Sequence, residues 1–269
     1  MDLTNKVVVV TGGSAGLGEQ ICYEAAKQGA VVVVCARRIN LIGKVREQCA
    51  ALSGREAFSY QLDIADPESV ERVVEAISAE VGPIDVLVNN AGFGLFENFV
   101  EIDLAVARQM FDVNVLGMMT FTQKVAIKMI EAGQGHIINV ASMAGKMATA
   151  KSTVYSATKF AVLGFSNALR LELKPLGVAV TTVNPGPIQT EFFDKADPTG
   201  TYLAAVDKIV LDPTKLAKEV VGSMGTSRRE INRPFVMEAA ARFYTLFPHL
   251  GDFIAGNILN KKIKESIKS

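Results

Sequence analysis

The sequence has few cysteines and histidines, and this shortage excludes two classes of protein. Its three cysteines, Cys22, Cys35 and Cys49, are odd in number and widely spaced, which predicts neither a disulfide framework nor a cysteine metal site. A reducing compartment, the cytoplasm, fits this usage best. His136 and His249 are too few and too far apart for a metal site, so we expect no bound metal.

Net charge and long apolar runs are absent as well. Lys and Arg together number 28, as do Asp and Glu, so the formal net charge is 0 and offers no electrostatic footprint for nucleic acid. No apolar run reaches the roughly 20 residues that a membrane-spanning helix needs. The N-terminus leads into a strand without the charged head and apolar body of a signal peptide. We therefore expect a soluble protein whose partners are small molecules or further copies of itself.

The chain does have strand-like and helix-like segments in alternation. Apolar, β-branched runs occupy residues 7–10, 31–34, 84–88, 137–140 and 178–183, with a weaker run at 57–62. They are apolar at consecutive positions, as in parallel strands covered on both faces. Helical spacing occupies 17–28, 40–52, 67–81, 103–131 and 152–174. This predicts an α/β fold: a single-domain, Rossmann-type, doubly wound parallel sheet with helices on both faces and a small C-terminal helical cap.

No repeat or linker divides the chain, so residues 1–269 are predicted to form one dinucleotide-binding domain. From residue 191 the sheet rhythm weakens, and we interpret 191–269 as a variable, substrate-side cap. Its aromatic and apolar residues either line an apolar substrate cleft or belong to the core: Phe192, Phe193, Tyr202, Leu203, Phe243, Tyr244 and Phe247.

A glycine-rich segment follows the first strand and opens the first helix. Residues 11–18 read Thr-Gly-Gly-Ser-Ala-Gly-Leu-Gly. Gly12 can take backbone angles closed to other residues, Gly16 lets the chain approach a phosphate, and Gly18 lets the helix pack on the strand. The helix start then offers free N–H groups to a pyrophosphate. The alternative is an ordinary glycine-rich turn.

The end of the second strand indicates which nucleotide is bound. An acid there would accept hydrogen bonds from a ribose 2′-hydroxyl, but the chain has Arg37 and Arg38, which suit a 2′-phosphate. NADP(H) is therefore preferred over NAD, unless the arginines only solvate the strand end. Asp63, after the third strand, is a candidate for the adenine side or for a helix cap.

Three residues could act together at a substrate oxygen, with Tyr155 moving the proton, Lys159 supplying positive charge and Ser142 holding the oxygen. Tyr155 and Lys159 are four apart on a predicted helix and so share one face. A tyrosine needs a nearby positive charge to act as a base near neutral pH, because its ordinary pKa is about 10. Ser142 follows a strand at the edge where ligands bind in such folds. Alternatively, Tyr155 and Lys159 share a face for packing and solubility.

Together these motifs resemble the short-chain dehydrogenase/reductase family. The glycine spacing, Asn89-Asn90-Ala91-Gly92 after a strand, Asn114 in Asp-Val-Asn-Val, Ser142 thirteen positions before Tyr155, and Asn184-Pro185-Gly186 match that family in order. The resemblance covers roughly residues 5–190. It implies that Tyr155 is the acid/base, Lys159 lowers its pKa and binds the nicotinamide ribose, Ser142 positions the carbonyl, and Asn114 keeps a water beside Lys159.

The resemblance also implies a cofactor site and an assembly. The expected cofactor-binding residues are Gly12, Ser14, Ala15, Gly16, Leu17, Gly18, Arg37, Arg38, Asp63, Ile64, Asn90, Ala91, Gly92, Tyr155, Lys159, Pro185, Gly186, Ile188 and Thr190. The family implies a homodimer or homotetramer built through the long helices around Asn114 and Tyr155. Pro185 to Thr190 could also be only a rigid turn.

The sequence thus predicts an NADP(H)-dependent oxidoreductase that acts on a carbonyl or secondary alcohol, with apolar ketones and oxoacyl groups favoured. The rival hypothesis is a regulatory protein that binds NADP(H) as a redox sensor without significant turnover. Lysines near the C-terminus follow apolar residues and could touch a membrane surface: Lys261, Lys262, Lys264 and Lys268, after Phe253, Ile254, Ile258 and Leu259. A helix packed on its own domain is the commoner outcome, so we expect no membrane contact.

Overall fold

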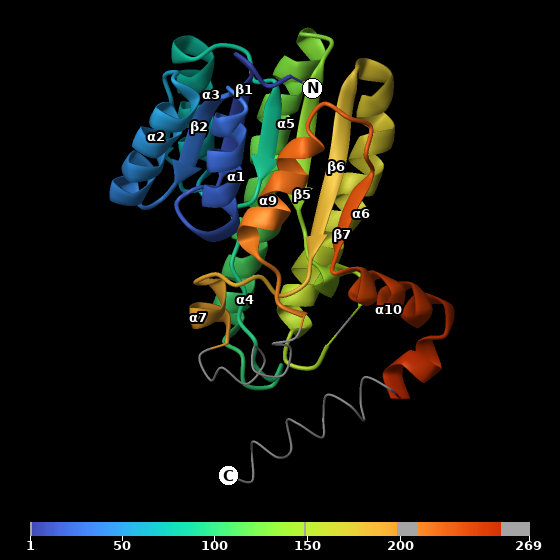
Figure 1. The fold of residues 1–269 in the computed structure, drawn as a ribbon. Helices are drawn as coiled ribbons and strands as arrows, with labels where there is room; N and C mark the ends of the chain where they lie inside the picture. The colour runs from blue at the N-terminus through green and yellow to red at the C-terminus, as the bar shows by residue number, and fades with distance from the viewer. Residues whose placement is uncertain (1, 148, 198–208, 254–269) are drawn as a thin grey trace.

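Seven parallel strands form one sheet in the order β3-β2-β1-β4-β5-β6-β7 (Figure 1). This computed structural model describes residues 2–147, 149–197 and 209–253. The strands are β1 (Val7–Thr11), β2 (Val31–Ala36), β3 (Phe58–Gln61), β4 (Val86–Asn89), β5 (Gly135–Val140), β6 (Val178–Pro185) and β7 (Glu230–Arg233). The order reverses between β1 and β4, which places a crevice for ligands at the carboxyl edge of the sheet. The predicted Rossmann-type α/β fold is confirmed.

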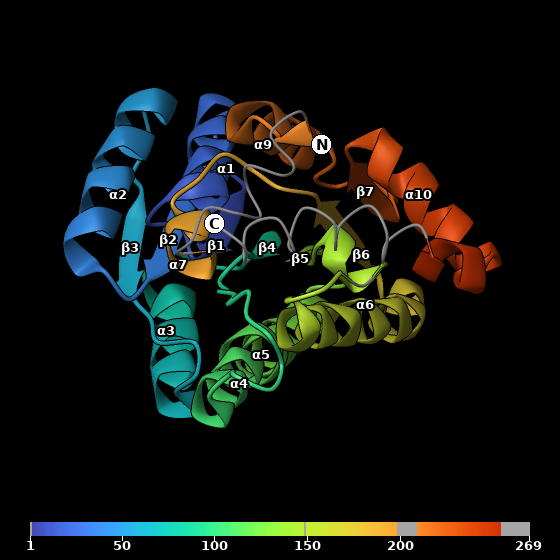
Figure 2. The same ribbon diagram turned by 90° about the horizontal axis from the view of Figure 1, so that it is seen from below.

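Helices cover both faces of the sheet, as Figure 2 shows from below. One face carries α1 (Gly16–Lys27), α2 (Ile39–Ser53) and α9 (Pro213–Gly222). The other carries α3 (Pro67–Glu80), α5 (Met118–Glu131) and α6 (Thr153–Leu173), with the short α4 (Leu104–Phe111) beside them. The remaining helices, α7 (Phe192–Ala196) and α10 (Phe235–Leu246), lie at the lower end of the sheet in Figure 1.

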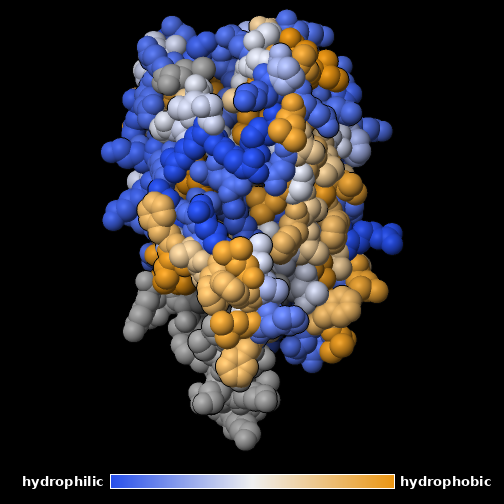
Figure 3. All heavy atoms as spheres, turned by 90° about the vertical axis from the view of Figure 1, so that its right-hand side faces the viewer, coloured by the Kyte–Doolittle hydropathy of each residue, from blue (hydrophilic) through white to orange (hydrophobic). Residues whose placement is uncertain are grey.

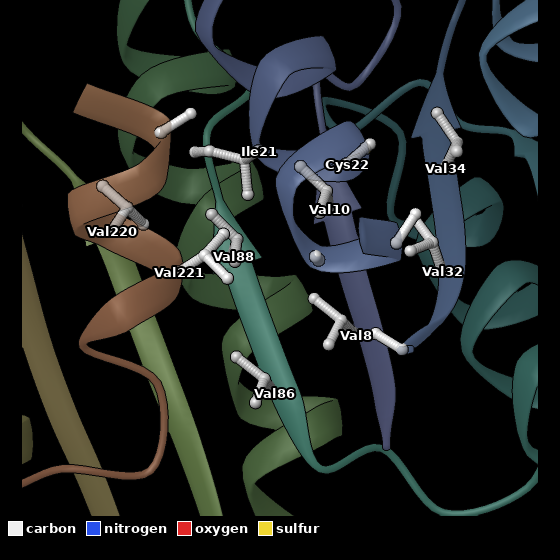
Figure 4. Packing of buried hydrophobic residues seen from close by; sticks show 14 of the residues in the cluster. Val8, Val10, Ile21, Cys22, Val32, Val34, Val86, Val88, Val220 and Val221 are labelled. Atoms are coloured by element: carbon white, nitrogen blue, oxygen red, sulfur yellow. The ribbon is translucent and has the colours of Figure 1, made fainter. Parts of the chain in front are cut away.

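The apolar strands serve two cores because successive side chains point to opposite faces. In β1, Val8 and Val10 pack toward α1 and α9, whereas Val7 and Val9 pack toward α3 and α5. Figure 4 shows Val8 and Val10 in the first of these cores, together with Ile21 of α1 and Val220 of α9. A strand buried on both sides must be apolar at every position, which is the pattern that the sequence shows.

The seventh strand corrects the sequence analysis, which expected six. β7 pairs parallel with β6, and Ile231 lies opposite Val183. Its sequence, Glu-Ile-Asn-Arg, lacks an apolar strand signal. β7 is a short strand at the edge of the sheet, where charged and polar side chains are common. The preceding helix α9 starts at the N-cap Asp212 and packs on α1. Part of the interval 191–269, predicted to form a cap, therefore extends the sheet.

The segment 103–131 also differs from the single helix predicted there. It consists of α4, a π-helical segment η1 (Asp112–Gly117) and α5. A π-helical segment is usually short and often marks a functional site, since it turns side chains away from the α-helical pattern. Asn114 lies within it.

Candidate active site

The glycine-rich segment forms a tight loop between β1 and α1. Gly12 and Gly16 have φ of +65° and +60°, values that favour glycine. A Cβ on Gly12 would lie 2.8 Å from the Ala91 Cα, and one on Gly18 would lie 2.4 Å from the Gly12 carbonyl oxygen. The N-cap of α1 is Ala15, whose side chain has no oxygen to occupy the helix N–H groups. The loop therefore leaves the start of α1 open to a ligand.

The segment after β4 supports this loop from below. The Asn90 side-chain nitrogen donates to the carbonyl oxygens of Thr11 (3.1 Å) and Gly12 (3.2 Å). The backbone N–H groups of Asn90 and Ala91 both donate to the Thr11 hydroxyl at 3.1 Å. Asn90 thus fixes the glycine loop, and Thr11 is a supporting residue that the sequence analysis did not assign. Its signal was its position directly before Gly12.

Both predicted arginines lie at the end of β2. Arg38 donates to the Ser14 hydroxyl at 3.0 Å through Nη2, and its Nη1 lies 3.7 Å from a carboxylate oxygen of Glu191. Arg37 is exposed. Asp63 accepts a hydrogen bond from the Ala65 N–H at 3.1 Å, so it shapes the turn after β3. The N-cap of α3 is Asp66, not Asp63.

Ser142, Tyr155 and Lys159 meet below the carboxyl ends of β5 and β6. The Ser142 hydroxyl donates to the Pro185 carbonyl oxygen at 3.3 Å and accepts from the Ala144 N–H at 3.1 Å. The Lys159 ammonium donates to the Val140 carbonyl oxygen at 3.0 Å and lies 5.7 Å from the centroid of the Tyr155 ring. Burial lowers the pKa of Lys159 to about 8, because the charged form loses its hydration.

Asn114 braces this group from the π-helical segment. It is buried, accepts from the Phe93 N–H at 3.0 Å and donates to the Phe93 carbonyl oxygen at 2.8 Å. It also donates to the Thr158 hydroxyl at 3.1 Å, on the turn of α6 between Tyr155 and Lys159. Asn114 therefore connects the chain after β4 to the helix that carries Tyr155 and Lys159.

One cavity of about 460 Å³ contains nearly all of the predicted site. Every predicted residue lines it except Gly18, which packs beneath the loop, and Asn114, which lies behind the wall. The volume falls within the range of small-molecule and cofactor sites. The structure thus brings the glycine loop, the arginines and the Ser142, Tyr155 and Lys159 group into one space.

Several wall residues were missed in the sequence. Phe96 meets the Tyr155 ring edge-on at 5.6 Å, and Phe192 lies 5.8 Å from that ring. A Cβ on Gly94 would lie 2.9 Å from a Tyr155 ring carbon, so any larger residue there would push against that ring. Met237 of α10 also lines the cavity. Gly94 and Phe96 come two and four residues after the Asn-Ala-Gly motif, and this proximity was the available signal for them.

The expected cleft aromatics divide into four groups. Phe192 and Phe193 line the cavity, which favours the cleft interpretation for them, although Phe193 is also buried. Tyr244 is half-buried and does not line the cavity. Phe243 and Phe247 are exposed and do not line it, so neither interpretation of them is right. Tyr202 and Leu203, like the terminal apolar residues and lysines from Ile254 onward, lie outside the described residues.

The described residues also bear on metals, thiols and membranes. Within residues 2–147, 149–197 and 209–253, no three His, Cys, Asp or Glu side chains gather as metal ligands would. All three cysteines are buried as free thiols. No helix in this part of the chain is long and apolar enough to cross a membrane.

Comparisons with known proteins agree with this geometry. A family model described as short chain dehydrogenase matches residues 6–200. Dehydrogenase/reductase SDR family member 7 of Homo sapiens is 36% identical over 199 residues, which are 72% of this chain and 59% of that protein. The chain thus spans 59% of the length of the first curated relatives that it matches.

Two solved structures are similar over nearly their whole length. An actinorhodin polyketide ketoreductase with NADPH has a TM-score of 0.77 and 29% identity, and the match covers 85% of this chain and 95% of that one. A 3-ketoacyl-(acyl-carrier-protein) reductase of Brucella melitensis complexed with NADH has a TM-score of 0.79 and 27% identity, over 86% and 97% of the two chains.

Proposed function

The chain belongs to the short-chain dehydrogenase family, and from this premise we propose that it is an NADP(H)-dependent oxidoreductase of carbonyls and secondary alcohols. One observation carries the proposal: Ser142, Tyr155 and Lys159 line the same cavity as the glycine loop. A proton-transferring group and a nucleotide cradle in one space are what hydride chemistry on a carbonyl requires.

The residues present fit a dinucleotide. Because Gly12 and Gly16 have no side chains, the loop leaves space for a ligand next to its backbone. The N–H groups at the start of α1 can bind a pyrophosphate. Pro185, Gly186, Ile188 and Thr190 line the cavity and are assigned to the nicotinamide; the Pro185 carbonyl oxygen accepts from Ser142, and Thr190 lies against Gly16. When bound, the nicotinamide would supply or accept the hydride.

NADP(H) is the proposed form because the end of β2 carries Arg37 and Arg38 and no acid. The contact of Arg38 with Ser14 holds a guanidinium against the glycine loop, close to where a ribose 2′-phosphate would need charge. The solved relatives described above contain NADPH in one case and NADH in the other, so the choice rests on the arginines of this chain.

Tyr155 is proposed to move the proton at the substrate oxygen. In reduction it gives its hydroxyl proton to the carbonyl oxygen, and in oxidation it takes a proton from the alcohol. Lys159, still largely charged at neutral pH with a pKa of about 8, favours the tyrosinate. The Ser142 hydroxyl, held by the Ala144 N–H, can turn from Pro185 to the substrate oxygen and orient it.

Asn114 is proposed as a positioning residue. Its two bonds to the Phe93 backbone and its bond to Thr158 fix the distance between the loop after β4 and α6. The family resemblance places a water beside Lys159, and we include that water in the proposal. Gly92 lies between Asn114 and Lys159: a Cβ there would lie 3.0 Å from the Asn114 side-chain oxygen and 3.8 Å from the Lys159 nitrogen. Because Gly92 has no side chain, the space between Asn114 and Lys159 is left open.

The proposed substrate is an apolar ketone or an oxoacyl group. Phe96, Phe192 and Phe193 form an aromatic wall beside Tyr155, and such walls favour apolar ligands. Both solved relatives described above are reductases of ketones or ketoacyl groups by name. The proposal extends to a homodimer or homotetramer, which is supported by exposed apolar side chains on η1, α5 and α6, among them Leu116, Ile127 and Phe160.

The test is the variant Tyr155→Phe, which keeps the ring and removes the hydroxyl. Turnover of ketones with NADPH should fall by at least about 100-fold, while the NADPH dissociation constant changes little. Tyr60→Phe removes a hydroxyl that binds Glu80, and neither residue lines the cavity, so this variant should leave both unchanged. Near-normal turnover in Tyr155→Phe would contradict the assignment.

A further inference from the structure

The turn after Ser142 is closed by its own backbone bonds. The N–H groups of Ala144 and Gly145 donate to the Ser142 hydroxyl at 3.1 Å and to the Ser142 carbonyl oxygen at 3.0 Å. They form the short 3₁₀ helix η2 (Met143–Gly145), which ends at its C-cap Lys146. Because these bonds make the turn one unit, a displacement of Lys146 would also displace the Ser142 hydroxyl.

One side of this turn lies directly on α6. A Cβ on Gly145 would lie 2.7 Å from the Lys159 carbonyl oxygen, so the backbones of η2 and α6 are in contact there. The same helix carries Tyr155. The turn is therefore seated on the helix of the active site, and the Lys146 side chain reaches from the turn to the edge of the sheet.

The edge strand β7 provides the partner of Lys146. The Lys146 ammonium forms an ion pair with the Glu230 carboxylate at 2.5 Å, and the two side chains are only 22% and 19% exposed. Figure 3 shows that hydrophilic side chains cover much of this side of the molecule, above its apolar lower part. The neighbouring Arg229 is 61% exposed, as is usual for a charged residue near a sheet edge. Glu230 differs, because its carboxylate turns inward to meet Lys146.

The charge of Glu230 depends on the bonds that it accepts. Burial alone would raise the pKa of this carboxyl, but the hydrogen bonds from Lys146 and Asn232 outweigh burial and lower the pKa. Glu230 is therefore charged at neutral pH. Removal of one partner from such a pair leaves the other charge partly buried and unpaired, which is costly.

Asn232 links the ion pair to the other side of Ser142. It lies two residues after Glu230 and so faces the same side of the sheet. Its Nδ2 donates to a Glu230 carboxylate oxygen at 3.1 Å, and its Oδ1 accepts from the Asn184 Nδ2 at 2.7 Å. Both amides are buried. Asn184 directly precedes Pro185, whose carbonyl oxygen accepts the Ser142 hydroxyl.

These contacts close a ring that passes through Ser142. On one side the ring runs through η2 to Lys146 and Glu230, and on the other side it runs through Pro185 and the two amides to the same carboxylate. Lys146, Glu230 and Asn232 do not line the cavity, so they can affect a reaction there only through the groups that they hold. Those groups are the Ser142 hydroxyl and the Pro185 carbonyl oxygen that it meets.

We propose that Lys146, Glu230 and Asn232 are positioning residues that hold Ser142 and the turn at Pro185 for hydride transfer. This role rests on the proposed function, because it requires that Ser142 orients a substrate carbonyl. A misplacement of about 1 Å in such a site can cost about 100-fold in rate. The glycine loop and the aromatic wall, which are proposed to bind the cofactor and the substrate, are formed by other residues. Loss of the ion pair should therefore affect kcat more than binding.

The test is Lys146→Met, which removes the charge and keeps most of the length of the side chain. In ketone reduction with NADPH, kcat should fall by about ten-fold, whereas the KM of the ketone and the NADPH dissociation constant should each change by less than about three-fold. Lys146→Arg keeps a cation that can pair with Glu230 and should retain at least about half of the parental kcat.

Lys6→Met is the matched control. Lys6 and Asp85 form an ion pair whose side chains are 33% and 14% exposed, where β1 and β4 begin, and neither residue lines the cavity. Thermal unfolding should show a comparable loss of stability in Lys6→Met, while kcat stays at the parental value. Glu230→Gln removes the charge of the other partner and should lower kcat as Lys146→Met does, which keeps the test decisive if one variant folds poorly.

Hydrogen exchange of the backbone gives a readout that does not need turnover. Residues 142–147 should exchange at least about five-fold faster in Lys146→Met than in the parent, and at the parental rate in Lys6→Met. Unchanged exchange of this segment, or equal kcat values for Lys146→Met and Lys6→Met, would overturn the role of the ion pair. A parent chain that reduces no carbonyl would contradict the proposed function instead, and the exchange rates would still decide whether the pair holds the Ser142 turn.

Discussion

The two halves of the sheet, the nucleotide side (β1, β2 and β4) and the catalytic side (β5, β6 and β7), hold the site by different means. In β1, β2 and β4 most of the buried side chains are valine, and the cofactor loop is fixed by backbone geometry at Gly12 and by bonds from Asn90. Around β5, β6 and β7 the buried side chains include hydrogen-bonded pairs, such as Asn184 with Asn232 at 2.7 Å. The nucleotide side therefore combines close backbone packing at the glycines with the Asn90 bonds, whereas the catalytic side depends mainly on polar contacts between side chains.

On the catalytic side, His136 of β5 makes two polar contacts outside the cavity. The Gly225 N–H donates to its Nδ1 at 2.9 Å, so that nitrogen carries no proton. Its Nε2 lies 2.9 Å from the Thr181 hydroxyl and is therefore the donor there. One ring nitrogen of His136 thus accepts and the other donates. These two bonds tie β5 to β6 and to the turn that precedes β7.

Among variants of the catalytic side, Lys159→Met should have the strongest effect. Lys159→Met should lower turnover by about 10²–10⁴-fold, because the charge that favours the tyrosinate is lost. The same variant should stabilise the fold by up to about 3 kcal/mol at pH 7, since the folded-state pKa of about 8 means that burying the charged lysine is unfavourable. Activity assays and thermal unfolding check the two halves of this prediction.

Lys128→Met on the exposed side of α5 is the control for that variant and should change neither quantity much. The sign also fixes a pH dependence. The folded pKa lies below the unfolded value of 10.5, so the cost of burying Lys159 is complete below about pH 8 and is relieved as the pH rises toward 10.5. A destabilised Lys159→Met would contradict the account.

The next effect tests the close backbone packing on the nucleotide side. Gly12→Ala places a Cβ 2.8 Å from the Ala91 Cα at a φ of +65°, so the loop must move. Dinucleotide affinity should fall by at least about 100-fold, and stability by about 2 kcal/mol. Gly43→Ala, within α2 and with open space around it, should instead stabilise by about 0.5–1 kcal/mol. If Gly12→Ala and Gly43→Ala behaved alike, close backbone packing at Gly12 would not be what holds the cofactor loop.

A smaller effect follows from His136. Burial lowers the pKa of His136 from 6.5 to about 4. Between these two pH values the unfolded chain binds a proton that the folded protein does not. The contribution of the neutral His136 to folding stability is therefore lost as the pH falls from about 6.5 to 4. His136→Gln lacks this titration. The stability difference between the parent and His136→Gln should therefore shrink by about 3 kcal/mol from pH 7 to pH 4, measured by urea unfolding. A difference independent of pH would show that His136 titrates normally.

The smallest effect concerns cofactor choice. Arg38→Ala should weaken NADPH binding by about ten-fold and change NADH binding less than about two-fold, because only NADPH carries the phosphate that a guanidinium would pair with. Arg46→Ala, on exposed α2, should affect neither. Equal losses for both nucleotides would assign Arg38 to the loop through Ser14 and not to the phosphate.

The comparison also explains what the sequence could predict. Runs such as Val7 to Val10 are apolar on both faces, so strand, burial and parallel pairing follow from composition. The glycine loop and the Tyr155 and Lys159 pair have fixed local spacing and could be assigned directly. β7 could not, because Ile231 is the single apolar residue of its four. The π-helical segment, the Asn114 bonds and the exposed side of α10 depend on tertiary contacts that no local pattern records.

The proposed function requires that the cavity binds NADP(H) and that carbonyls are reduced there. The most direct measurement is titration of the protein with NADPH and with NADH, followed by oxidation of the bound NADPH across a panel of apolar ketones, oxoacyl thioesters and aldehydes. We expect NADPH to bind more tightly than NADH and at least one apolar carbonyl to be turned over. Tight NADPH binding without turnover of any carbonyl would indicate a redox sensor instead, and preference for NADH would contradict the assignment of the arginines.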